Sequence, residues 1–117
     1  MSDYHEPTTE LSKHTRDCVR ALRSLIEEVE AVDWYHQRVD VANDTQLAKV
    51  LAHNRDEEME HAAMTLEWLR RNMPGWNEVL KTYLFTTEDI TEIEEEGEGG
   101  ESGDGSLGIG KMRKEEE

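Results

Sequence analysis

The chain has 117 residues, with 28 acidic residues against 13 lysines and arginines, so its formal net charge is −15 at pH 7. This acidity argues against a nucleic-acid-binding protein, which needs a basic surface to meet phosphates, and it favours cations as partners. Only 35% of the residues are hydrophobic, which is a small share for a self-sufficient globular domain. We therefore expect the chain either to be partly disordered or to complete its core by oligomerising.

Runs of apolar residues are short, and the longest contain three residues, such as Val50-Leu51-Ala52, which excludes a transmembrane helix. The N-terminus lacks the basic and apolar pattern of a secretory signal peptide, so we do not expect export by that route. The single cysteine, Cys18, cannot form an internal disulfide, which fits a reducing compartment. These features predict a cytoplasmic protein without membrane contact.

Two long amphipathic helices are predicted over residues 8–72. A proline followed by Thr8 and Thr9 marks the start of the first helix, with a threonine as its N-cap. The helices are separated by Asn43-Asp44-Thr45, which turns readily, and the second ends near Asn72-Met73-Pro74-Gly75 because proline cannot continue a helix. The apolar stripe of the first helix recurs at steps of three and four residues and consists of Cys18, Leu22, Leu25, Val29, Val32, His36 and Val39.

The second helix repeats this spacing in two neighbouring stripes. One consists of Leu47, Leu51, Asn54, Glu58, His61, Thr65 and Trp68, and the other of Ala48, Ala52, Met59, Ala62, Leu66 and Leu69. Each helix is about 45 Å long, and a tight turn between them gives an antiparallel hairpin. A short helix is expected over residues 76–82, and another over 87–96 with Thr87 as its cap. The predicted fold class is all-α, a hairpin that dimerises into a four-helix bundle.

The C-terminal third differs in composition. Residues 86–104 contain nine acidic residues, four glycines and no basic residue, which is typical of a flexible linker. Apolar side chains return at Leu107, Ile109 and Met112. We therefore divide the chain into a helical domain at 1–96, an acidic glycine-rich linker at 97–104, a segment with apolar residues at 105–113 and a charged end at 114–117.

Three ionisable residues are predicted to converge inside the hairpin. With the turn near residue 43, Glu28 faces Glu58, and His61 shares a helix face with Glu58. A buried carboxylate needs a compensating cation or proton, and Glu-x-x-His opposite a lone Glu is half of a di-iron carboxylate site. Two hairpins related by a two-fold axis supply four carboxylates and two imidazoles, which suit two iron or manganese ions.

Simpler interpretations exist for these and for neighbouring residues. Glu-x-x-His arises by chance in acidic helices, where the pair is usually solvated. His36 on the apolar stripe could be a hydrogen-bonded interior residue, and His53 faces Asp33, with which it could form an ion pair. An acidic group in the first helix could line an entrance for metal ions or could be an ordinary solvated helix face. It consists of Glu27 and Glu30 beside Trp34.

Several longer strings resemble the encapsulated ferritins of the ferritin superfamily. The similarity spans most of residues 5–96 and is carried by residues 27–35 (EEVEAVDWY), 53–64 (HNRDEEMEHAAM), 66–72 (LEWLRRN) and 82–85 (TYLF). The GSLGIG string at 105–110 resembles the peptide with which cargo proteins dock inside encapsulin shells, although the charged residues 114–117 extend beyond that peptide.

The resemblance implies a ferroxidase centre at a dimer interface, with the dimers arranged in a ring-like decamer. Iron is the metal that it implies, oxidised from Fe(II) to Fe(III) by dioxygen or peroxide and stored in the lumen of an encapsulin nanocompartment that holds the protein through Gly105–Arg113. The ligands would be Glu28, Glu58 and His61 of each chain, with Tyr35 beside the centre. Metal would enter past Glu27, Glu30 and Trp34. The alternative is a non-catalytic helical scaffold or cargo protein with structural zinc or calcium.

Overall fold

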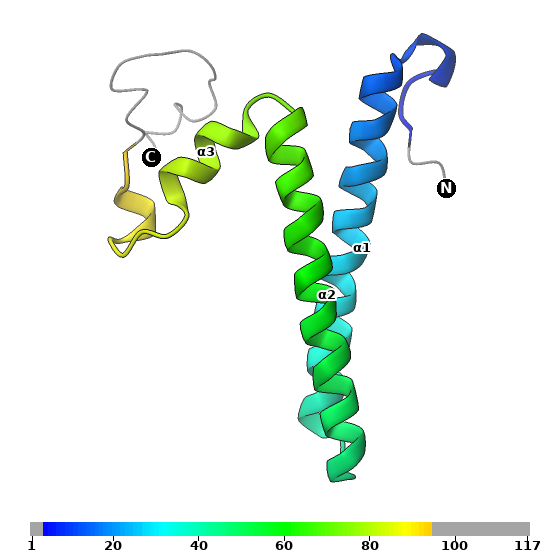
Figure 1. The fold of residues 1–117 in the computed structure, drawn as a ribbon, viewed down its shortest axis with the longest axis vertical. Helices are drawn as coiled ribbons and strands as arrows, with labels where there is room; N and C mark the ends of the chain where they lie inside the picture. The colour runs from blue at the N-terminus through cyan, green and yellow to red at the C-terminus, as the bar shows by residue number, and fades with distance from the viewer. Residues whose placement is uncertain (1–3, 95–117) are drawn as a thin grey trace. The chain divides into compact units, whose positions relative to one another are not determined.

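The computed structural model describes residues 4–94, and within this range every regular element is a helix (Figure 1). The elements are η1 (Thr8–Glu10), α1 (Lys13–Val41), α2 (Thr45–Asn72), α3 (Trp76–Tyr83) and η2 (Ile90–Glu92). The predicted all-α fold class is confirmed. The chain divides into two compact units, the first ending at Asn72 and the second beginning at Met73.

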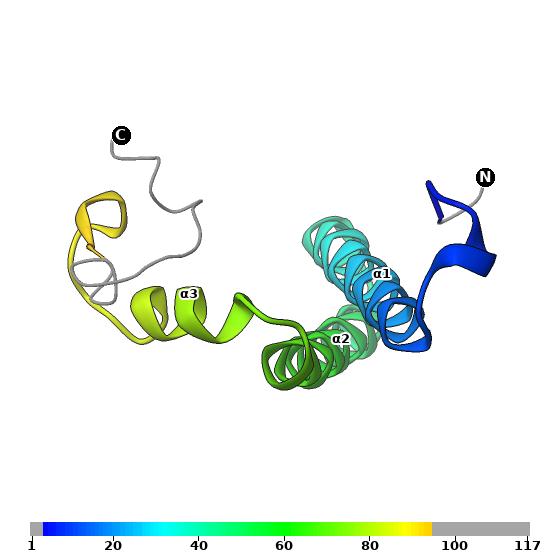
Figure 2. The same cartoon turned by 90° about the horizontal axis from the view of Figure 1, so that it is seen from above.

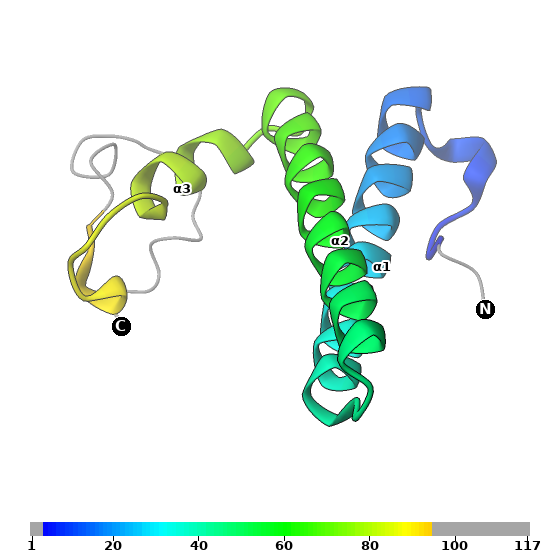
Figure 3. The ribbon, with the colours of Figure 1, turned by 60° about the horizontal axis from the view of Figure 1, so that its bottom comes forward.

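The first unit is an antiparallel hairpin of α1 and α2, which lie side by side along their length (Figures 2 and 3). Its turn falls where the sequence predicts it, between Val41 and Thr45. Asp44 begins the second helix because its Oδ1 accepts a hydrogen bond of 2.8 Å from the backbone N–H of Leu47. The hairpin leaves the ends of α1 and α2 remote from this turn together at what we call the open end.

The predicted start of the first helix is wrong by a few residues. Thr8–Glu10 form a 3₁₀ turn, after which Leu11 is extended. The N-cap of α1 is Ser12, whose Oγ accepts a hydrogen bond of 3.0 Å from the backbone N–H of Thr15. A serine two residues past the turn thus provides the cap that we had expected from a threonine.

Burial in the hairpin is concentrated near the open end. Among the described residues, the buried hydrophobic side chains are Cys18 and Leu69. His14 joins the two helices there, with its Nε2 2.9 Å from the backbone oxygen of Asn72. Much of the apolar face farther along is uncovered, with large exposed side chains at Ile26, Val29, Trp34, Met59 and Met64. The hairpin therefore lacks a core of its own over most of its length.

The second unit begins with a turn at Met73 and contains α3, close to the predicted bounds. Gly75 has a φ of 103°, a backbone conformation open to glycine, and Trp76 Nε1–H donates to the sulfur of Met73 at 3.3 Å. The helix expected from Thr87 is wrong in its described part. The structure has only the three-residue turn η2, capped by Asp89.

The predicted linker at 97–104, the segment at 105–113 and the charged end at 114–117 lie outside the described residues. Within the described part, α1 and α2 are long enough to be considered as membrane spans, and neither is apolar enough to be one.

Candidate metal centre

Glu58 and His61 lie one turn apart on α2 and their side chains meet. His61 Nδ1 is 3.4 Å from Glu58 Oε1, and both side chains are partly exposed. Two donor atoms that each bind one ion at about 2.1 Å can be at most about 4.2 Å apart. The carboxylate and the imidazole are therefore close enough to share a single cation.

Glu28 lies in the middle of α1 and is half-buried. Its Oε1 atom is fully buried and has no hydrogen-bond partner. Leaving a buried polar atom unsatisfied costs about 1–3 kcal/mol, and more when the group is charged. A carboxylate oxygen in this position is suited to receive a cation or a donor from outside the chain.

One chain does not assemble the full triplet. Within residues 4–94, no group of three or more His, Cys, Asp or Glu side chains is placed to hold a metal ion. The structure thus brings Glu58 and His61 together but does not add Glu28 to them. The site that the sequence predicts takes its remaining ligands from a second copy.

The residues that the resemblance places around the centre differ in exposure. Tyr35 is half-buried, and the guanidinium of Arg38 lies 5.2 Å from the centre of its ring, a cation–π contact. Glu27, Glu30 and Trp34 are exposed on α1. They can therefore meet ions that arrive from solvent.

The two remaining helical histidines are placed differently from the sequence prediction. His36 is exposed, not interior, and its Nδ1 lies 3.1 Å from Nη1 of Arg55 on α2. His53 pairs with Glu57 one turn away at 3.8 Å, not with Asp33. Asp33 instead accepts a hydrogen bond from Gln37. His53 and Asp33 thus each pair with a residue one turn away on their own helix, whereas the partner of His36 lies across the hairpin.

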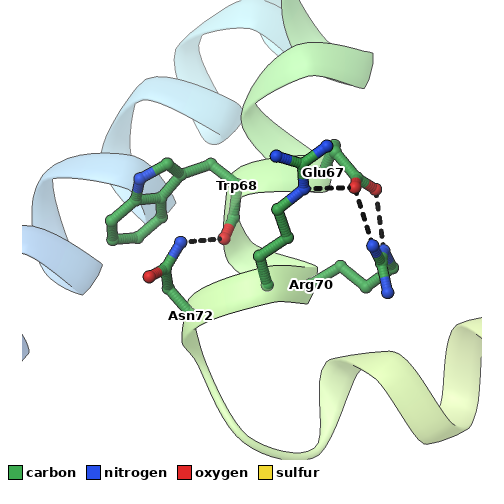
Figure 4. Close-up of polar contacts among 5 residues, drawn as sticks. Glu67, Trp68, Arg70 and Asn72 are labelled. Carbon is green, nitrogen blue, oxygen red and sulfur yellow. Dashed lines mark hydrogen bonds and ion pairs between the residues drawn. The ribbon is translucent and has the colours of Figure 1, made fainter.

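An ion cluster in the last two turns of α2 was not predicted (Figure 4). Arg70 donates two hydrogen bonds of 2.8 Å to the Glu67 carboxylate, and Arg71 donates one of 2.7 Å. These bonds, first that from Arg70 and then that from Arg71, lower the pKa of Glu67 from 4.5 to about 2. The sequence could have predicted this cluster, because Arg70 and Arg71 follow Glu67 by three and four residues, the spacing at which side chains on a helix are neighbours.

The same region of α2 is closed by Asn72, whose side-chain amide donates to the backbone oxygen of Trp68 at 2.9 Å (Figure 4). His14 bonds to the backbone oxygen of Asn72, which is one of the last four carbonyl groups that a helix end leaves without a partner in the helix. The end of α2 is therefore well defined.

Comparison with known proteins gives consistent matches. The sequence profile of the EncFtn-like family matches residues 3–87. A ferritin-like protein of Thermotoga maritima is 66% identical over 114 residues, which cover 96% of this chain and 100% of that protein. An encapsulated ferritin-like protein of Rhodospirillum rubrum is 55% identical over 123 residues, which cover 95% of this chain and 88% of that protein.

A solved structure agrees with these matches. The crystal structure of a protein from Nitrosomonas europaea superposes with a TM-score of 0.73 at 58% identity, covering 76% of this chain and 98% of the other. The residues that match the family profile include the whole hairpin that carries Glu28, Glu58 and His61. The chain belongs to the EncFtn-like family.

Proposed function

We propose that the chain is a ferroxidase that oxidises Fe(II) to Fe(III) at a di-iron site formed between two copies. The observation that carries the proposal is the buried Oε1 atom of Glu28, which has no hydrogen-bond partner. The contact between Glu58 and His61 adds a carboxylate and an imidazole that can share one cation. The name of the relative described as encapsulated ferritin-like supports iron as the metal.

Pairing of two hairpins follows from the exposed apolar face. Ile26 and Val29 flank Glu28 on α1, Met59 follows Glu58 on α2, and all three are about half exposed. Exposed apolar surface of this kind marks an interface. A second copy laid on this face would bury it and would bring four carboxylates and two imidazoles together, as two divalent ions require. Such dimers would then build the ring-like decamer.

Each residue then has a stated role toward Fe(II), which is the substrate. Glu28 and Glu58 offset the charge of the ions and favour the more highly charged Fe(III) product. His61 contributes a neutral nitrogen that fixes the ligand arrangement. Glu27, Glu30 and Trp34 receive Fe(II) from solvent, and Tyr35 lies next to the reacting ions. Dioxygen or peroxide takes up the electrons.

The test is the rate at which Fe(III) absorbance develops when Fe(II) is added in air. Glu28→Ala, Glu58→Ala and His61→Ala should each lower that rate at least about tenfold, because each change removes a ligand twice per dimer. His36→Ala and His53→Ala are the matched controls and should stay close to the unmodified protein. Unaltered rates in all three ligand variants would contradict the assignment.

The same assay separates the ferroxidase from a non-catalytic scaffold. A scaffold with structural zinc or calcium at the same site would bind metal, yet Fe(III) would form no faster with the protein than without it. We further propose that the protein is cargo of an encapsulin nanocompartment, held there through Gly105–Arg113 and supplying oxidised iron for storage. The word encapsulated in the name of the Rhodospirillum rubrum relative supports this.

A further inference from the structure

Two metal-ligating side chains outside the proposed iron site meet at the open end of the hairpin. His14 and Cys18 lie one turn apart near the start of α1, and Cys18 Sγ is 3.6 Å from His14 Nε2. The same nitrogen is 2.9 Å from the backbone oxygen of Asn72, the last residue of α2. A sulfur atom and a carbonyl oxygen thus approach one imidazole nitrogen, and the three atoms come from two helices.

Hydrogen bonding satisfies this group only in part. The carbonyl oxygen of Asn72 can only accept, so the Nε2 atom of His14 carries the proton and donates it. A protonated Nε2 cannot accept the S–H of Cys18. The sulfur can therefore act toward this nitrogen only as a weak acceptor, although Cys18 is 6% exposed. The buried sulfur shares a proton that the Asn72 oxygen already holds.

The distances are close to those around a bound zinc ion. Zinc binds thiolate sulfur at about 2.3 Å and imidazole nitrogen at about 2.0 Å, which places the two atoms about 3.5 Å apart at a tetrahedral angle. The observed separation is 3.6 Å. An oxygen ligand would lie about 3.4 Å from the nitrogen, so the Asn72 oxygen, now at 2.9 Å, would move outward by about 0.5 Å. This shift breaks no hydrogen bond within α2, because the last carbonyl of a helix has no partner in the helix.

The residue types select the class of cation. A thiolate with an imidazole suits Zn(II) and other thiophilic ions, whereas the carboxylates of the proposed iron site suit harder ions. Residues four apart lie on one face of a helix, so His14 and Cys18 can bind one ion without rearranging α1. His14 is exposed, which lets an ion reach the group from solvent.

We propose that His14, Cys18 and the backbone oxygen of Asn72 bind one Zn(II) ion, with water as the fourth ligand. The thiol proton passes to the buffer on binding, and the imidazole keeps its single proton on Nδ1. The bound ion joins the start of α1 to the end of α2. None of these residues belongs to the proposed iron site, so the proposal stands or falls independently of ferroxidase activity.

Co(II) reports on this site because Cys18 is the only cysteine of the chain. A thiolate bound to Co(II) gives a sulfur-to-metal charge-transfer band that carboxylate and imidazole ligands do not give. The reduced full chain should develop this band up to one ion per chain, and Zn(II) should remove it by displacement. Cys18→Ala, which suits a buried position, should abolish the band. Absence of the band in the unmodified chain would overturn the proposal.

His14→Gln distinguishes a built site from a thiol that binds metal alone. Glutamine keeps a donor for the Asn72 oxygen but removes the imidazole ligand. Co(II) affinity measured from the band should fall at least about tenfold. His53→Ala breaks the pair of His53 and Glu57, also four residues apart, and should leave the affinity unchanged. Equal affinity in His14→Gln would reduce the band to adventitious thiol binding and would overturn the proposal.

The part played by α2 is tested by hydrogen exchange, because no substitution removes a backbone oxygen. The measurement uses a chain with Glu28→Ala, which lacks a ligand of the proposed iron site. Zn(II) should slow amide exchange at least about tenfold both at the start of α1 and in the last turn of α2. The effect should disappear when His14→Gln is added. Protection confined to α1 would show that α2 takes no part, and would overturn the two-helix site.

Discussion

A single carboxylate oxygen, Oε1 of Glu28, links the stability of the lone chain to its proposed chemistry. It is buried and unpaired in the hairpin, so it opposes folding of the metal-free chain while remaining available to a cation. The same atom is thus unfavourable before metal binds and useful afterwards. This opposition can be measured without following iron oxidation.

Glu28→Gln should separate the two effects, because it removes the charge and nearly keeps the shape. In metal-free protein the variant should be as stable as the unmodified chain or more stable by about 1 kcal/mol. Added divalent metal should raise the melting temperature of the unmodified chain but not that of the variant. Asp40→Asn, at an exposed position on the same helix and outside the proposed site, is the control. An equal metal-induced shift in Glu28→Gln would remove Glu28 from the site.

Glu67 predicts how the hairpin responds to acid. Its pKa is lowered from 4.5 to about 2 in the folded chain by the hydrogen bonds from Arg70 and Arg71. Its contribution to stability is therefore present above pH 4.5 and is lost as the pH falls toward 2. Helicity followed by circular dichroism should decline over this range less steeply in Glu67→Gln than in the unmodified chain. Parallel acid profiles would show that the cluster is not coupled to folding.

At the level of elements, the ends of helices decide how well the hairpin forms. Ser12 and Asp44 each accept a hydrogen bond from a backbone N–H in the first turn of a long helix. Thr8 and Thr9, which the sequence favoured as caps, belong to η1 and have no such role. The difference is specific enough to test by substitution.

Ser12→Ala and Asp44→Ala should each lower the free energy of unfolding by about 1 kcal/mol, the usual value of an N-cap. Thr9→Ala should change it by no more than about 0.5 kcal/mol. Urea unfolding at one fixed protein concentration measures all three, since association would otherwise shift the midpoint. A loss in Thr9→Ala as large as that in Ser12→Ala would contradict the observed start of α1.

The elements were predictable where a strong local signal exists. The turn at Asn43-Asp44-Thr45 and the stop before Pro74 depend on backbone preferences within a few residues, and both are confirmed. In place of the helix expected from Thr87, the structure has the three-residue turn η2, which begins at Asp89 because the Asp89 side chain accepts a hydrogen bond from the backbone N–H of Thr91. The spacing of Glu58 and His61 predicted a shared helix face, on which their side chains meet, but the predicted convergence with Glu28 is absent from the described part of one chain. The partner of His36 depends on packing between helices, which spacing on one helix does not determine, whereas the spacing of four residues between His53 and Glu57 was a signal in the sequence.

At the scale of the whole molecule, the proposed docking peptide lies in a different part of the sequence from the proposed iron site. Glu28, Glu58 and His61 all lie in the first compact unit, which ends at Asn72. Gly105–Arg113, the proposed docking peptide, begins more than thirty residues later in the sequence. Removal of the peptide should therefore leave the hairpin and its chemistry unaffected.

Deletion of residues 105–117 should abolish loading into a co-expressed encapsulin shell and leave iron oxidation by the free protein within about twofold of the full chain. Occupancy of purified shells measures the first effect, and Fe(III) absorbance measures the second. Residues 105–113 fused to an unrelated fluorescent protein should confer loading on it. If the chain without residues 105–117 filled the shells to the same level as the full chain, a surface of the helices would be what binds the shell.

The concentration of burial around Cys18 and Leu69 has a consequence for how long a chain survives. Amide hydrogens near these residues should exchange slowly, whereas those around Glu28 and Glu58 should exchange quickly in a chain without a partner. A protease should likewise cut first around Glu28 and Glu58, in the part of the hairpin that a second copy covers in the proposed dimer. Unpaired chains would thus be removed soonest, and metal that holds copies together would set how much of the protein persists.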